Sequence, residues 1–297
     1  MIHPLKALGL LAVTLALPGF AQQAPRASDE GPRTARIYVS VLGPRGAPVT
    51  DLTAADFTVR EDGVAREVLR AAPATDPLQV VLLVDDSQAA TDAIQPLREG
   101  LRAFVDQLHG RAEIGIVTVA DRAASLVAPT TDRTALNKGI DRVFARSGSG
   151  AYLLDGIIDT ARGFTRRHAA RPVIVAVTME GVEFSNLHYQ NVLKELENSG
   201  AALHVLAVGT PASSMADEMR NRNQVLAYGT EETGGRREQL LTPSGLSDAL
   251  PRVAQELLHQ YLVTYSRPET LIPPEKIQVS VSRPDVTVRA RTRTAGR

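Results

Sequence analysis

The chain has 297 residues, of which 43% are hydrophobic and 22% are charged, so it is long enough to bury the core of one large domain or of two unequal ones. Lysine plus arginine and aspartate plus glutamate each number 33, so no basic excess points to nucleic acid and no acidic excess points to a solvated tail. The absence of cysteine excludes a disulfide framework and a thiol-linked lipid.

Residues 1–21 have the pattern of a cleaved secretory signal peptide. Lys6 precedes the apolar run ALGLLAVTLAL, and Gly19 and Ala21 occupy the small-residue positions before a cleavage site. The run is too short to span a bilayer, and no later segment reaches the ~20 apolar residues of a membrane helix. We therefore predict a periplasmic or secreted protein without a membrane span in its mature chain; the alternative is an uncleaved anchor.

Residues 22–34 are polar and contain proline and glycine, which predicts a linker. The segment 35–75 then alternates as a half-buried strand does, with Ile37, Val39 and Val41 on one face. Further on, Asp62-Gly63 separates two short alternating runs and predicts a tight hairpin turn. This segment is therefore expected to be a small β unit.

Residues 76–257 change character and predict an α/β domain. Nearly continuous apolar runs are typical of strands buried on both faces of a parallel sheet, and segments with apolar residues at steps of three and four separate them. We therefore predict a doubly wound, mostly parallel sheet with helices on both faces. The four predicted strands cover 78–85, 112–120, 172–178 and 202–209.

Residues 258–297 return to alternation, as in the run KIQVSV at 276–281. Both ends of the mature chain are thus predicted to be β. Because the termini of a domain usually lie close together, we expect the end strands to pair into one antiparallel β subdomain. The α/β domain would be inserted between them.

The stretch QVVLLVDDSQAA at 79–90 ends a predicted buried strand in Asp85 and Asp86. One interpretation is a phosphate-accepting receiver domain, but none of the three lysines after the signal peptide follows a buried strand with proline behind it. A second is a metal site, because ligands bind at the carboxyl ends of strands in open α/β sheets. A third is that the carboxylate of Asp85 caps the loop through backbone N–H groups, with Ser87 doing the same more weakly.

Several ordered segments resemble the von Willebrand factor type A domain, in particular exported bacterial VWFA-related domain proteins. They cover most of the mature chain and include GAPVTDLTAADFTVREDGVAREV, VLLVDDS, SGSGAYLLDG, VTMEGVE and ELLHQYLVTYSRP. The resemblance implies a Rossmann-like sheet and a metal-ion-dependent adhesion site made by three loops. Such a site holds Mg²⁺ through hydroxyl and carboxylate oxygens and water, and an acidic residue of the partner completes it.

The metal-binding pattern is incomplete in this chain. Asp85 and Ser87 match two positions of the first loop, but Ala89 occupies the third; Ala151 stands at the threonine position, and Glu180 replaces the aspartate. Two of five positions are thus retained, one is altered and two offer no oxygen. We therefore predict a degenerate site (Asp85, Ser87, Glu180) without a tightly bound metal ion; weak binding of Mg²⁺ or Mn²⁺ is the alternative.

The sequence predicts an exported, non-enzymatic module that binds an unidentified protein through the carboxyl-end loops. Three alternatives stay open: a low-affinity Mg²⁺-dependent adhesion domain, a scaffold that uses the edges of the β subdomain, and a hydrolase with Asp85 and Glu180 as acid and base. A nucleotide is not expected, because GSGAYL lacks the third glycine of a dinucleotide loop. The predicted binding residues are Asp85, Asp86, Ser87, Gln88, Ala151, Tyr152, Glu180 and Phe184.

Overall fold

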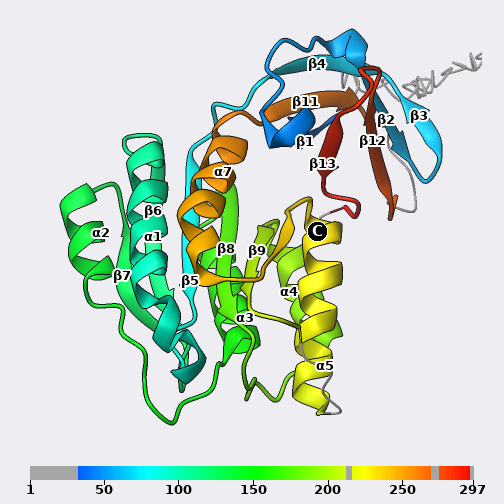
Figure 1. The fold of residues 1–297 in the computed structure, drawn as a ribbon. Coiled ribbons are helices and arrows are strands. Elements are labelled where there is room, and N and C mark those ends of the chain that lie inside the picture. The colour runs from blue at the N-terminus through cyan, green and yellow to red at the C-terminus, as the bar shows by residue number, and fades with distance from the viewer. Residues whose placement is uncertain (1–32, 212–215, 269–273, 295–297) are drawn as a thin grey trace, which may run out of the picture. The chain divides into compact units, whose positions relative to one another are not determined.

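A computed structural model describes residues 33–211, 216–268 and 274–294 (Figure 1). The predicted signal peptide and residues 22–32 of the predicted linker lie outside the described residues. Thr34, which the sequence assigned to the linker, is the first residue of β1. Within the described ranges, no helix combines the length and apolar character needed to cross a membrane.

The apolar runs of the α/β segment form a six-stranded sheet of order β10-β9-β8-β5-β6-β7. Five strands are parallel and β7 runs antiparallel to β6 at one edge. All nine residues of the central β8 are buried, as the continuous apolar run predicts. The doubly wound, mostly parallel sheet is confirmed. The strands are β5 (Leu78–Val84), β6 (Ala112–Thr118), β7 (Ala124–Thr130), β8 (Arg171–Met179), β9 (Ala202–Val208) and β10 (Arg237–Leu240).

Helices cover both faces of this sheet and form two separate apolar cores. On one face α1 packs closely on α7: a Cβ on Gly100 would lie 2.6 Å from the carbonyl oxygen of Leu246. The helical segment from α5 to α6 was not predicted, because its first part, DEMRNRNQ in α5, has no apolar period. The helices around the first core are α1 (Ile94–Leu108), α2 (Arg133–Ile140) and α7 (Leu246–Leu258). The helices on the side of the second core are α3 (Leu153–Arg166), α4 (Tyr189–Ser199), α5 (Asp217–Gln224), the short π-helix Val225–Gly229 and α6 (Thr230–Thr233).

Strands from the two ends of the chain pair with each other, as predicted (Figure 1, blue with orange and red). They form two antiparallel sheets, of orders β13-β1-β11-β4 and β12-β2-β3, that share one apolar core. The predicted hairpin turn is present, with positive φ at Asp62 (46°) and Gly63 (82°). The strands are β1 (Thr34–Leu42), β2 (Phe57–Glu61), β3 (Val64–Arg66), β4 (Val68–Pro73), β11 (Tyr261–Ser266), β12 (Ile277–Val281) and β13 (Thr287–Ala290), and short 3₁₀ turns cover Pro44–Gly46, Ala54–Asp56, Gln88–Ala93 and Pro243–Gly245.

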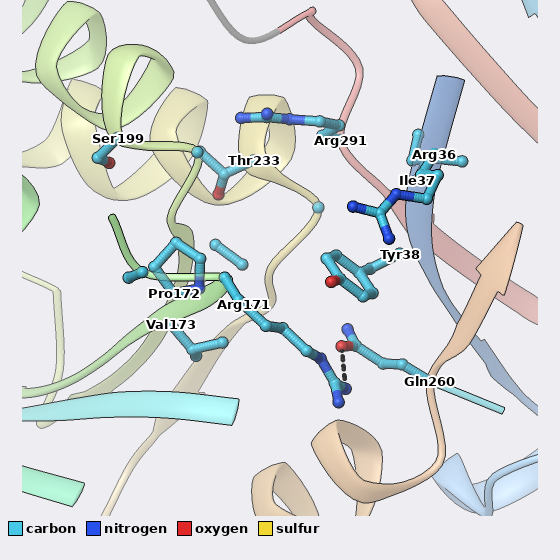
Figure 2. A pocket seen from close by; sticks show the side chains of 15 residues that line it. Arg36, Ile37, Tyr38, Arg171, Pro172, Val173, Ser199, Thr233, Gln260 and Arg291 are labelled. Carbon is cyan, nitrogen blue, oxygen red and sulfur yellow. Dashed lines mark hydrogen bonds between the residues drawn. The ribbon is translucent and has the colours of Figure 1, made fainter. Parts of the chain in front are cut away.

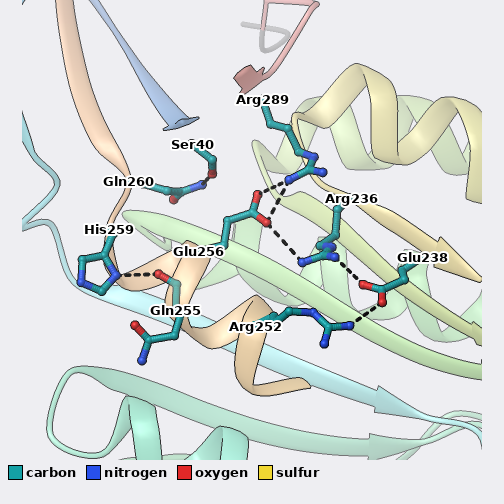
Figure 3. A network of polar contacts seen from close by, with 9 residues as sticks. All are labelled: Ser40, Arg236, Glu238, Arg252, Gln255, Glu256, His259, Gln260 and Arg289. Carbon is teal, nitrogen blue, oxygen red and sulfur yellow. Dashed lines mark hydrogen bonds and ion pairs between the residues drawn. The ribbon is translucent and has the colours of Figure 1, made fainter. Parts of the chain in front are cut away.

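A buried carboxylate connects α7 to the β subdomain (Figure 3). Glu256 on α7 is 1% exposed, and both of its oxygens accept hydrogen bonds from Nη1 of Arg289 on β13, at 3.2 and 3.1 Å. Nη1 of Arg236 lies 3.7 Å from Glu256 Oε2. Next to this pair, Gln260 Nε2 donates to Ser40 Oγ on β1 at 3.0 Å. The Glu256 contacts hold α7 against β13, and the Gln260 contact ties the segment after α7 to β1.

Replacing Glu256 with glutamine should lower the free energy of unfolding by about 1.5–3 kcal/mol, because its charge-assisted hydrogen bonds with Arg289 and its ion pair with Arg236 are weakened. Urea denaturation measures the effect. The matched control is Glu195→Gln, which removes a partly exposed carboxylate 3.0 Å from Arg162 and should change stability by no more than about 1 kcal/mol. Equal denaturation midpoints for Glu256→Gln and wild type would contradict the role given to this network.

Candidate functional site

The carboxyl ends of the parallel strands carry a set of loops that we call the strand-end face. Its loops contact one another: the backbone N–H of Gln88 donates to the carbonyl of Ser149 at 3.3 Å, and a Cβ on Gly181 would lie 2.7 Å from that of Ala89. The structure therefore brings all three loops of the predicted site together. The strand-end face consists of residues 85–93, 119–123, 141–152, 180–188, 209–211 and 241–245.

Asp85 is buried, with 1% exposure, and its carboxylate is used within the chain. Oδ1 accepts a hydrogen bond from the backbone N–H of Ser87 at 3.0 Å. Oδ2 accepts one from the backbone N–H of Met179 at 2.9 Å and a longer one from the Thr178 hydroxyl at 3.4 Å. Asp85 thus ties the loop after β5 to the end of β8.

Asp86 is also buried and holds a different pair of loops. Its Oδ1 accepts from the backbone N–H of Ala120 at 2.8 Å, and its Oδ2 lies 3.0 Å from Nε of Arg146. Beside it, Gln88 Oε1 accepts from the backbone N–H of Gly148 at 2.8 Å. Both residues therefore position the 146–150 segment.

Three further positions of the family pattern, those of Ser87, Ala89 and Ala151, offer little to a metal ion. Ser87 is 2% exposed, and no hydrogen bond to its side chain is found among the described residues. Ala89 has no side-chain oxygen. Ala151 joins loops through its backbone, because its N–H donates to Val182 O and its carbonyl accepts from Phe184 N, both at 2.8 Å.

A buried arginine that the sequence analysis missed lies beside these loops. The side chain of Arg222, on α5, is 2% exposed, and Nη1 lies 3.6 Å from Glu180 Oε2. Nη2 donates to the Thr178 hydroxyl at 3.2 Å and to the Met179 carbonyl at 3.1 Å. The Thr178 hydroxyl thus lies between this guanidinium and Asp85. No sequence signal marks Arg222, since it is one of several charged residues in a polar helix.

The buried side chain of Glu183 caps the first turn of α3. Its Oε1 accepts from the backbone N–H groups of Leu153 and Ser185, each at 3.1 Å, while Oε2 is buried and has no partner among the described residues. Burial of the side chain raises the pKa of Glu183 to about 7. The group that caps α3 is therefore a buried carboxyl that releases its proton at a higher pH than an exposed glutamate does.

The stability of the protein should depend on pH through Glu183. The unfolded chain releases this proton near pH 4.5 and the folded chain near pH 7, so the folded state binds more protons in this interval. The free energy of unfolding contributed by Glu183 therefore falls as the pH rises from 4.5 to 7, by at most about 1.4 kcal/mol per pH unit.

Glu183→Gln should remove this dependence and should be more stable relative to wild type at pH 8 than at pH 5. Urea denaturation of the two proteins across this range measures the difference. The control is Glu231→Gln, at an exposed position. Its free energy of unfolding should change with pH as that of wild type does. If the difference in unfolding free energy between wild type and Glu183→Gln stays constant from pH 4.5 to 8, the proposed titration of Glu183 is contradicted.

Large apolar side chains are exposed on the strand-end face. Of the seven such residues among the described ranges, four lie in its loops. Phe184 also packs its ring against Tyr152, with centroids 5.9 Å apart. A cavity of about 510 Å³ adjoins Val182, Phe184 and Glu180. The four exposed residues are Phe144 (62%), Val182 (59%), Phe184 (48%) and Leu241 (75%).

Several of the oxygens that a Mg²⁺ ion would need at this site are engaged by the chain itself. Mg²⁺ requires near-octahedral oxygen ligands, whereas both Asp85 oxygens already accept hydrogen bonds from the chain and Glu180 faces the Arg222 cation. The described residues contain no group of three or more histidine, aspartate or glutamate side chains arranged to hold a metal ion.

Comparison with known families identifies the class of this domain. Residues 80–180, from β5 to the end of β8, match the family model described as von Willebrand factor type A domain. This segment contains the central strands and all three loops of the predicted metal site. This part of the chain is therefore similar to von Willebrand factor type A domains, as the sequence resemblance indicated.

Several solved structures are similar to this chain at low sequence identity. A von Willebrand factor type A protein from Catenulispora acidiphila is 10% identical, with a TM-score of 0.51 over 89% of this chain and 74% of that chain. Proximal thread matrix protein 1 from the mussel byssus, with a zinc-occupied MIDAS motif, is 16% identical, with a TM-score of 0.51 over 67% and 49%. BatB from Bacteroides thetaiotaomicron is 16% identical, with a TM-score of 0.45 over 60% and 98%. A search of curated proteins finds no match.

Proposed function

We propose that this chain is an exported, non-enzymatic protein whose von Willebrand factor type A domain binds another protein through the strand-end face, without a tightly bound metal ion. The observation that carries the proposal is the exposure of Phe144, Val182, Phe184 and Leu241 in loops at one end of the sheet. Exposed apolar side chains that gather on one surface are typical of protein interaction sites, and phenylalanine is enriched in interfaces.

The position of Arg222 supports the metal-independent part of the proposal. A metal ion at this site would supply positive charge among Asp85, Ser87 and Glu180. Here a guanidinium of the chain itself pairs with Glu180 and bonds Thr178, the neighbour of Asp85. The loops are therefore held by an internal cation, and partner binding need not wait for an ion from solution.

The contacts of the two carboxylates support a non-enzymatic function over the hydrolase alternative. Both Asp85 oxygens accept backbone hydrogen bonds, and Glu180 pairs with Arg222. Neither group is placed as a free general base within reach of a substrate proton. The alternative of a β-edge scaffold has an observation of its own, because Val64 on edge strand β3 is 55% exposed.

Partner capture tests the proposed face. The purified protein carrying a photo-crosslinker is incubated with an extract of the cells that produce it, in buffer with EDTA. The double variant Val182→Ser, Phe184→Ser should weaken a specific crosslinked band by roughly tenfold or more, since the few residues that dominate an interface each cost more than about 1 kcal/mol when they are truncated. Val64→Ser, matched in exposure on the β subdomain, should leave the band unchanged.

The reciprocal pattern separates the two interaction hypotheses. If the band is lost in Val64→Ser but kept in the strand-end double variant, the partner binds the edges of the β subdomain. Capture that requires Mg²⁺ in place of EDTA would support the Mg²⁺-dependent adhesion domain instead. Unfolding curves of each variant ensure that a lost band reflects the surface and not the fold.

A further inference from the structure

A second cavity, of about 210 Å³, lies at the opposite end of the sheet, where β8 begins and α4 ends (Figure 2). The β subdomain closes it through β1 and the segment that follows β13. Its lining contains three arginines and no aspartate or glutamate. The arginines are Arg36, Arg171 and Arg291.

Arg171 is the most deeply buried of the three, with 4% exposure. One nitrogen, Nη2, donates to Gln260 Oε1 at 2.6 Å and to the Leu257 carbonyl, and the guanidinium lies 5.1 Å from the centroid of the Tyr38 ring. Its Nε is buried and has no hydrogen-bond partner among the described residues. No carboxylate of the described chain lies within ion-pair distance of Arg171, so its charge is buried without a direct counterion.

The segment that carries Arg291 passes very close to the backbone at Gly234, and this places Arg291 at the same cavity. A Cβ on Gly234 would lie 2.4 Å from the carbonyl carbon of Ala290, and Gly234 has a φ of 77°, so this crossing requires glycine. Within the described ranges, the Arg291 guanidinium forms no hydrogen bond or ion pair. Burial lowers the pKa of Arg291, against the opposing charge of Glu197.

The charge of the third arginine is partly balanced. Asp76 lies 3.8 Å from Nη1 of Arg36 and also accepts a hydrogen bond from the Tyr38 hydroxyl at 2.7 Å. Two guanidinium groups, those of Arg171 and Arg291, therefore remain at one small cavity without a direct acidic partner. Burying an unpaired charge is costly unless a counterion accompanies it.

We propose that this cavity binds a small oxyanion, carried as the phosphate or carboxylate group of a small molecule. Guanidinium groups present planar, paired donors that match the oxygens of both anions. The volume of about 210 Å³ is below the ~300 Å³ at which pockets for drug-sized ligands begin, so the ligand is small. The proposal is independent of the strand-end function, because the cavity lies at the other end of the strands.

Isothermal titration of the purified protein in a chloride buffer with sodium phosphate, and separately with succinate, tests the proposal and distinguishes the two anion classes. At least one should bind with a saturable, one-site isotherm. Arg291→Gln should weaken that binding roughly 10- to 100-fold, as expected for the loss of one charge-assisted hydrogen bond. Arg293→Gln removes the same charge two residues away, from a half-exposed side chain 3.7 Å from Glu232, and should change the affinity by less than about threefold.

A second variant shows whether weaker binding by Arg291→Gln is caused by a folding defect. The Arg36 side chain is 63% exposed, so Arg36→Gln should fold normally and still weaken binding. Arg291→Gln itself should unfold at a temperature no lower than Arg293→Gln, because it removes a half-buried charge that has no direct partner among the described residues. Absence of saturable binding for both anions would overturn the proposal, and so would equal weakening by Arg291→Gln and Arg293→Gln.

Discussion

Arg222→Met is expected to lower the free energy of unfolding by about 3–5 kcal/mol, the usual result of removing one member of a buried ion pair. Methionine keeps most of the side-chain volume, so the loss reports the missing charge and hydrogen bonds. Glu180 would then face no cation, and the Met179 carbonyl and Thr178 hydroxyl would each lose a donor. Urea denaturation at pH 7 measures the loss.

The control for this variant is Arg162→Met, which removes a half-exposed arginine 3.0 Å from Glu195 and should cost no more than about 1 kcal/mol. A double-mutant cycle with Glu180→Gln sharpens the test, because the coupling between Arg222 and Glu180 should be favourable. Arg222→Met with a stability within about 1 kcal/mol of wild type would contradict the role of Arg222 as an internal cation.

Asp85→Ala is the second substitution with a large expected effect, again a loss of about 3–5 kcal/mol. The backbone N–H groups of Ser87 and Met179 would lose their acceptors, and each unsatisfied buried group costs about 1–3 kcal/mol. The link between the β5 loop and the end of β8 would also be lost. Thermal and urea unfolding measure the effect.

Asp92→Ala is the matched control, because Asp92 is an exposed carboxylate seven residues further along the same loop. It should change stability by less than about 0.5 kcal/mol, as surface substitutions usually do. If Asp85→Ala were no more destabilising than Asp92→Ala, the Asp85 carboxylate would not be serving as a structural hydrogen-bond acceptor. Ligand binding would then better explain why aspartate occupies this position.

Much of the fold could be predicted because its signals are local. A strand buried on both faces needs a continuous apolar run, and β8 has one from Val173 to Val177. The hairpin turn needs positive φ, which Asp62-Gly63 supplies. The pairing of the chain ends followed from alternating patterns at both termini. β7 was missed because an edge strand with Pro129 inside it has no continuous apolar run.

The candidate site was predictable only in part. The loops that carry Asp85, Ala151 and Glu180 could be placed at one edge because parallel strands end there. The cation beside them could not, since Arg222 comes from a polar helix more than 40 residues after Glu180 in the sequence. The same limit applies to Glu183, whose role as a cap for α3 depends on a contact between segments 30 residues apart.

The metal independence of the strand-end face is tested most directly by thermal unfolding in EDTA and then in millimolar Mg²⁺ or Mn²⁺. Ser87→Ala is the companion variant, because it removes a potential ligand and leaves the Asp85 contacts in place. Wild type and variant should each melt at the same temperature under all three conditions. A metal-dependent rise in wild type, which reaches about 2.7 kcal/mol at a hundredfold excess over the dissociation constant, and its loss in Ser87→Ala would contradict the proposal and establish a working metal site.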